Sequence, residues 1–217
     1  KRAETLRAEG KRVLILTTTK MMVPQEQEIF AAYEQTGQES VISATASVWQ
    51  ERRVAEKKLK ERVQSILDTY GCCVAGSLIP GTEKFGMLPE KLMEDLLYLA
   101  DEILIEADGS AHMPVKAPAE HEPVLFPYMD EVVIVMGAHA IGKPLMEVCH
   151  RVDYAKELLK CDADKIVTAA DLETLAEQGY AIPIQKQYPW MKISKVTGKD
   201  IKLCLTAEKK DKERDKQ

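Results

Sequence analysis

The sequence predicts an α/β fold with a mostly parallel sheet flanked by helices. Apolar segments of strand length alternate with longer segments whose apolar residues recur at helical spacing, which is the pattern of βαβ units. The apolar run at residues 103–105 ends on carboxylates and a glycine, as strands do at the ligand-binding edge of open α/β sheets. The 217 residues, 45% hydrophobic and 30% charged, can bury one good core. We therefore expect one α/β domain over residues 1–205 and a charged, disordered tail over residues 206–217.

Glycines and prolines set the expected element boundaries in the first half of the chain. Gly10 should stop a first helix, and Pro24 suits the first turn of another helix with Gly37 near its end. Apolar residues at helical spacing predict a long helix that Gly71 ends. The expected elements are helix 2–9, strand 12–16, helix 24–33, helix 48–70 and strand 72–79.

The second half continues the alternation of strands and helices. Pro144 should open a helix, and His150 and Arg151 should cap or begin another. Thr168 is cap material for a helix that we expect to stop at Gly179. The expected elements are helix 89–100, strand 102–107, strand 132–136 and helix 168–177.

Composition excludes several classes of protein. The net charge of −5 gives no electrostatic footprint for nucleic acid or an anionic membrane surface, and no apolar run is long enough to span a membrane. Five cysteines without framework spacing favour free thiols in a reducing compartment, hence the cytoplasm. Cys72 and Cys73 are adjacent on a strand and point to opposite faces, and the default role for Cys149, Cys161 and Cys204 is a small buried hydrophobe.

The strongest candidate site follows the strand at residues 102–107. Glu106 and Asp108 are placed to orient water and to hold Mg²⁺, and Gly109 lets a phosphate approach the backbone. Three prolines between Pro114 and Pro123 stiffen the next loop, which carries Lys116, His121 and Glu122 past these carboxylates. Alternatively, Asp-Gly is an ordinary turn, and a histidine between glutamates is ordinary surface chemistry.

A second candidate site lies at the end of the first strand. Thr17, Thr18, Thr19 and Lys20 offer three hydroxyls and an ammonium group that could hold phosphate oxygens. Threonine is also simply a good strand residue, so this segment alone leaves the structural interpretation open.

Residues 137–144 imitate a phosphate loop. The segment Gly-Ala-His-Ala-Ile-Gly-Lys-Pro fits G-x-x-x-x-G-K but has Pro144 where the motif needs a hydroxyl for Mg²⁺. Proline also removes a backbone N–H from the phosphate cradle. We therefore expect a structural turn or a wall of the site here.

Several segments together resemble the YqeC family. They are V-L-I-L-T-T-T-K-M, E-A-D-G-S, P-V-K-A-P-A-E-H-E-P, M-G-A-H-A-I-G-K-P-L and C-H-R, and they run in the family's order from about Gly10 to Arg151. The resemblance implies a phosphate-loop NTPase-like fold and favours a binding role for Arg151. It also implies a glycine-rich phosphate loop upstream of Lys1. The family's asparagine-lysine-x-aspartate element is only approached by residues 197–200, so base selectivity stays open.

The function that the resemblance implies is a nucleotide-dependent accessory factor for maturation of a selenium-dependent molybdenum hydroxylase. ATP or GTP with Mg²⁺ would be its ligands, and a molybdenum hydroxylase or its maturation proteins would be its partners. In this view Asp108 holds Mg²⁺, the threonines and Lys20 sense phosphate, and Lys116 neutralises an anionic group. The alternative is a carrier or switch that binds a nucleotide or an anionic cofactor without turnover.

Overall fold

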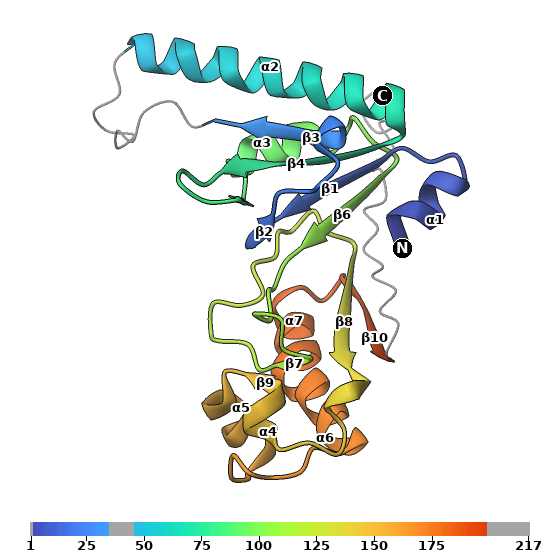
Figure 1. Ribbon diagram of the computed structural model, residues 1–217, viewed down its shortest axis with the longest axis vertical. Helices are drawn as coiled ribbons and strands as arrows, with labels where there is room; N and C mark the ends of the chain where they lie inside the picture. Colours follow the sequence, from blue (N-terminus) through green and yellow to red (C-terminus); the bar gives the residue numbers. More distant parts are fainter. Residues whose placement is uncertain (1, 35–45, 199–217) are drawn as a thin grey trace, which may run out of the picture. The chain divides into compact units, whose positions relative to one another are not determined.

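A computed structural model describes residues 2–34 and 46–198 of the protein (Figure 1). Contacts within the chain divide the described residues into two compact units. The first unit comprises residues 3–34 and 46–106, and the second unit comprises residues 107–198 together with Arg2. Each unit combines helices and strands, which confirms the α/β class. The single domain over residues 1–205 stays a prediction, and the expected tail over residues 206–217 lies outside the described residues.

The first unit is built on a mixed sheet. Its strand order is β2-β5-β4-β1-β6, and β3 pairs with β4. Strands β1, β3, β4 and β6 are parallel, whereas β5 is antiparallel to β2 and β4. The elements are α1 (Arg2–Ala8), β1 (Val13–Thr17), β2 (Lys20–Met22), β3 (Phe30–Tyr33), α2 (Ala46–Tyr70), β4 (Cys72–Leu78), β5 (Lys84–Gly86), α3 (Glu90–Leu96) and β6 (Glu102–Glu106).

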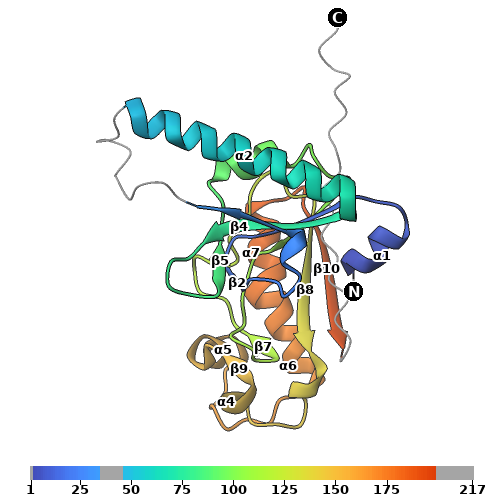
Figure 2. The ribbon, with the colours of Figure 1, turned by 45° about the horizontal axis from the view of Figure 1, so that its top comes forward.

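Helix α2 lies along β3 and β4 in both views of the ribbon (Figures 1 and 2). Four apolar side chains at helical spacing, Leu59, Val63, Ile66 and Leu67, are buried. Gly71 ends the helix at φ +69°, as predicted, because glycine adopts this left-handed conformation without a steric penalty. The burial of these side chains fixes α2 on the sheet, against β3 and β4.

The helix expected over residues 24–33 is wrong. Only Gln27–Ile29 forms a short 3-10 turn, and Phe30–Tyr33 is the strand β3. Phe30 packs against Phe85 and lies in a buried cluster with Val74. Pairing with β4 and burial of Phe30 therefore decide the conformation, because short segments take their structure from long-range contacts more than from local propensity. The expected helix end at Gly37 lies outside the described residues.

The second unit contains two small parallel strand pairs and a set of helices. Strand β8 pairs with β10 over seven residues, and β7 pairs with β9. The elements are β7 (Val115–Lys116), β8 (Glu131–Gly137), α4 (Leu145–Val148), β9 (Cys149–His150), α5 (Val152–Leu159), α6 (Ala169–Thr174), a π-helical segment (Leu175–Ala181), α7 (Ile182–Gln187) and β10 (Lys192–Gly198).

Helix starts in the second unit agree with the sequence, but one helix end does not. Pro144 precedes α4, Arg151 precedes α5, and Thr168 forms a capping box with Asp171 at the start of α6. Gly179 does not stop this helix, since the chain stays helical to the end of α7. A Cβ at Gly179 would lie 3.1 Å from Pro118 Cδ, so glycine serves close packing here.

Candidate functional site

The carboxyl ends of β1 and β6 meet at one edge of the first unit's sheet. The two strands are parallel neighbours, and Thr17 is in register with Glu106. The Thr17 hydroxyl donates to the Glu106 carbonyl at 3.0 Å and accepts from the Thr19 N–H at 3.0 Å. The Thr18 N–H donates to the same carbonyl at 2.9 Å. Thr17 is therefore a buried part of the turn.

The remaining predicted residues of this edge are more accessible. Thr18, Thr19 and Glu106 are half-buried, and Lys20 is exposed at the start of β2. A ligand at this edge would therefore meet Thr18, Thr19 and Lys20 before Thr17, whose side chain is 1% exposed.

The second unit holds a buried ion cluster around Lys116. This side chain is only 5% exposed and forms ion pairs with Asp108 and, at 2.9 Å, with Glu122. Its ammonium also donates to the Gly109 carbonyl at 3.0 Å. Strand β7 supplies Lys116, and its pairing with β9 sets the lysine beside His150 in register. An ammonium group has three N–H bonds, so these three acceptors can use all of them.

Asp108 has a partner for each carboxylate oxygen. Oδ1 pairs with Lys116, and Oδ2 accepts from the Tyr180 hydroxyl at 2.7 Å. Burial and the negative charge of Asp108 raise the pKa of Tyr180 well above its usual range, so this hydroxyl stays protonated and donates. Mg²⁺ at Asp108 would have to displace Lys116 or Tyr180.

Glu122 links the buried lysine to the rim of the cluster. Oε2 contacts Lys116 and accepts from the Ala119 N–H at 3.1 Å, and Oε1 accepts from Arg151 at 2.7 Å. Burial raises the pKa of Glu122, but hydrogen bonds from Lys116 and Ala119 and the charges of Lys116 and Arg151 outweigh it. The pKa of Glu122 consequently lies below its usual range, and the carboxylate is ionised at neutral pH.

The structure thus brings together only some of the predicted site residues within one unit. Asp108, Gly109, Lys116, Glu122 and Arg151 form the ion cluster, with His121 at its rim. The residues at the edge of the first unit's sheet form a separate group: Thr17, Thr18, Thr19, Lys20 and Glu106.

Sequence reasoning missed Tyr180, which binds Asp108 across 72 residues of sequence. The residue lies in the π-helical segment, one position after Gly179. π-Helical turns within helices are frequent at functional sites. Gly179, which the sequence predicts as a helix stop, instead indicates close packing of the helix beside Tyr180.

The described residues hold no group of three or more histidine, cysteine, aspartate or glutamate side chains suited to a metal ion. Burial raises the pKa of Cys73 to about 12 and that of Cys149 to about 11. These thiols stay protonated, in agreement with the expected role of Cys149 as a small buried hydrophobe. Cys161 is half-buried, and Cys204 lies outside the described residues.

The imitation phosphate loop is a hydrogen-bonded turn. The Gly142 N–H donates to the Val167 carbonyl at 2.9 Å, and the Leu145 N–H donates to the Lys165 carbonyl at 2.9 Å. The Lys143 N–H donates to Ala140 at 3.1 Å. A phosphate cradle needs such amides free to face the ligand, so the turn lacks the donors as well as the hydroxyl.

We expect Pro144→Ser to give no gain in affinity for ATP or GTP, although it completes the sequence motif. The reason is that the amides of residues 142, 143 and 145 already have acceptors. Calorimetric titration of both proteins with Mg²⁺ and nucleotide checks this. Micromolar binding that Lys143→Ala abolishes would instead make this turn the phosphate site.

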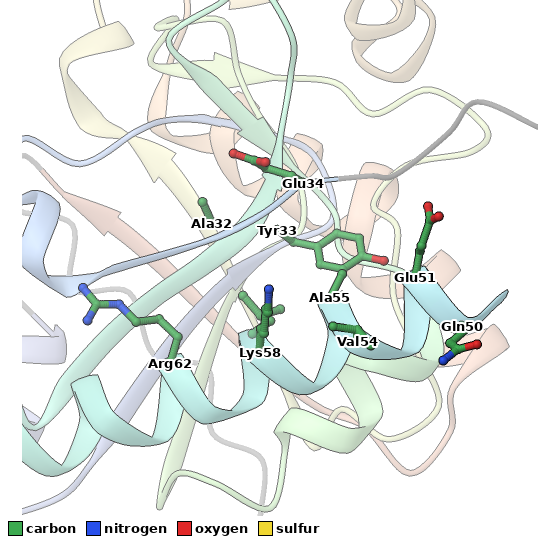
Figure 3. A pocket seen from close by; sticks show the side chains of 10 residues that line it. Ala32, Tyr33, Glu34, Gln50, Glu51, Val54, Ala55, Lys58 and Arg62 are labelled. Atoms are coloured by element: carbon green, nitrogen blue, oxygen red, sulfur yellow. The ribbon is translucent and has the colours of Figure 1, made fainter. Parts of the chain in front are cut away.

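A groove of about 700 Å³ lies in the first unit between α2 and the end of β3 (Figure 3). It is lined by Ala32, Tyr33, Glu34, Gln50, Glu51, Val54, Ala55, Lys58, Leu59 and Arg62. None of the predicted site residues lines this groove.

Residues 197–198 end β10, and the rest of the expected base-recognition element, Lys199 and Asp200, lies outside the described residues. Among the described helices, none has the length and apolar character needed to cross a membrane.

Comparison with known proteins agrees with the motifs. The YqeC protein family matches residues 2–153. The uncharacterized protein YqeC of Escherichia coli strain K12 is 33% identical over 183 residues, which are 80% of this chain and 60% of that protein. The chain thus spans about 60% of the length of this relative. No solved structure shows significant similarity to the chain. The family match covers more than half of the chain and includes both candidate sites, and the chain therefore belongs to the YqeC family.

Proposed function

We propose that the protein is a nucleotide-dependent accessory factor in the maturation of a selenium-dependent molybdenum hydroxylase. One observation carries the nucleotide part of this proposal. Adjacent parallel strands end in register at Thr17 and Glu106, with Thr18, Thr19 and Lys20 directly after them. Hydroxyls, an ammonium group and a carboxylate at the carboxyl edge of such strands suit phosphate and Mg²⁺.

The parallel strands also support a phosphate-loop NTPase-like fold. In that class a hydroxyl of the phosphate loop and an aspartate of a neighbouring strand hold Mg²⁺, and ligands lie at the carboxyl ends of the strands. β1 and β6 are parallel neighbours that end in register on Thr17 and Glu106. We propose ATP or GTP with Mg²⁺ as ligands, Glu106 as the residue that orients water, and Asp108 as a metal residue that exchanges its present partners for Mg²⁺.

The accessory role rests on family membership. A molybdenum hydroxylase or its maturation proteins are the proposed partners, and the cytoplasm is the proposed location. His121, Glu122 and Arg151 are proposed for an anionic substrate, with Lys116 holding Glu122 in place, because Lys116, His121 and Arg151 all lie beside the Glu122 carboxylate. The alternative is a carrier or switch without turnover, in which Asp108 keeps its ion pair with Lys116 and its hydrogen bond from Tyr180.

Lys20→Ala should weaken the binding of Mg²⁺-nucleotide about tenfold, because it removes a charge-assisted contact to phosphate. Calorimetry on the protein, including any residues that precede Lys1 in nature, measures this. An exposed lysine of α2, Lys57, provides the matched control, and Lys57→Ala should bind as the wild type does. Phosphate release during incubation separates a hydrolase from a carrier. The proposal fails if neither ATP nor GTP binds.

A further inference from the structure

The rim of the ion cluster presents two side chains to solvent around one carboxylate oxygen. Oε1 of Glu122 lies 2.7 Å from Arg151 Nη2 and 3.9 Å from His121 Nε2. The His121 side chain is 74% exposed and that of Arg151 is 29% exposed. Two nitrogen-bearing side chains from distant parts of the sequence therefore converge on the accessible side of Glu122.

The buried side of the cluster fixes this arrangement. Lys116 and the Ala119 N–H hold the other oxygen of Glu122 at 2.9 and 3.1 Å. Lys116 is itself held by Asp108, whose second oxygen is bound by Tyr180. Lys116 has little capacity left for a ligand, because its three acceptors lie within the protein. Its role is to position Glu122, which in turn positions Arg151.

Arg151 has donors to spare. Glu122 is its partner, and the buried Nε–H has no acceptor among the described residues. A guanidinium group carries five N–H bonds in a planar fork that matches the oxygens of phosphate or carboxylate. A buried donor without an acceptor calls for an explanation, and a bound water or ion is one such explanation.

The charges of the cluster also suit an anion. Asp108 and Glu122 are balanced by Lys116 and Arg151, so the cluster has no surplus negative charge that would repel one. Arg151 directly precedes α5, whose start has no side-chain cap. The first amides of a helix attract negative charge, and they add to the field of the guanidinium.

We infer that Arg151 and His121 form a site for an oxyanion at the rim of the ion cluster, the phosphate or carboxylate group of a small ligand, with Glu122 and Lys116 as positioning residues. This inference deepens the proposed function. That the bound anion is the substrate rests on the proposed function. The site itself requires neither nucleotide nor Mg²⁺.

The test titrates inorganic phosphate, and separately acetate, into the whole chain without nucleotide. The NMR signal of the Arg151 Nε–H is followed together with the rise in melting temperature. Phosphate alone should bind if the ligand carries a phosphoryl group, and acetate alone if it carries a carboxylate. Arg151→Gly should weaken binding about tenfold or more, and His121→Ala about two- to fivefold.

Two variants guard against misinterpretation. Glycine at 151 tolerates the left-handed backbone of this position, φ +65°, and Arg151→Lys retains the charge should the glycine variant unfold. Lysine lacks the planar fork and should bind more weakly than the wild type. His139→Ala removes an exposed histidine elsewhere in the second unit and should change nothing.

The inference is overturned if neither anion gives a saturable shift, or if both Arg151→Gly and Arg151→Lys bind as tightly as the wild type. A loss of anion affinity in His139→Ala equal to the loss in Arg151→Gly would show that the anion binds nonspecifically. That result would overturn the inference as well. Binding here with no binding of ATP or GTP refutes the nucleotide proposal alone. Nucleotide binding without any anion at Arg151 refutes this inference alone.

Discussion

Lys116→Ala should lower the free energy of unfolding by roughly 3–5 kcal/mol, the range for breaking a buried ion pair by removing one partner. The lysine is 5% exposed and serves two carboxylates and a carbonyl. Alanine leaves Asp108 with one partner and Glu122 without its buried cation, and water cannot fully replace the lost ammonium. Urea unfolding followed by circular dichroism measures the loss.

An exposed lysine in the same unit provides the control. Lys186→Ala on α7 should change stability by less than about 0.5 kcal/mol, as surface substitutions usually do. Asp108→Asn combined with Lys116→Ala should cost less than the sum of the single changes, because the two residues share one ion pair. A Lys116→Ala protein as stable as the wild type would mean that Lys116 is not part of a buried network.

The resemblance to the YqeC family implied that Lys116 neutralises an anionic group. The structure places its ammonium among three acceptors of the protein itself and leaves the side chain 5% exposed. The prolines around it predict a stiff loop but not the direction of the side chain. That direction depends on acceptors from three places, Asp108, Gly109 and Glu122, which only the folded chain brings together.

Elements with strong local signals were predictable. α2 has a long apolar repeat and a terminal glycine, and β6 has an apolar run that stops on charged residues, so their own sequences determine them. β3 was not predictable, because four residues carry too little periodicity and the strand depends on pairing with β4. The predicted helix stop at Gly179 was wrong for a related reason. Glycine is needed at this position because the helix packs closely against Pro118.

The sequence indicated which residues belong to the candidate site better than it indicated what each residue does there. Charged residues after a strand end and within a proline-rich loop indicated Asp108 and Glu122, and the resemblance to the YqeC family indicated Arg151. The structure joins them through Lys116 and hydrogen bonds. Their roles depend on which oxygen meets which donor, and a linear pattern cannot show that. Tyr180 had no chemistry-bearing neighbour in sequence, so nothing local connected it with Asp108.

Tyr180→Phe should lower the free energy of unfolding by about 1–3 kcal/mol, because it leaves one oxygen of the largely buried Asp108 without a donor. The change removes one oxygen atom and keeps the ring, so packing is preserved. Thermal unfolding measures the loss, and Tyr154→Phe on the exposed side of α5 is the control that should have no effect. In the Asp108→Asn background the cost of Tyr180→Phe should shrink, since the charged acceptor is gone. If Tyr180→Phe costs the same with Asp108 and with asparagine, the hydroxyl does not act through the charge of this carboxylate, and its other contact, the Lys116 carbonyl at 3.5 Å, accounts for the cost.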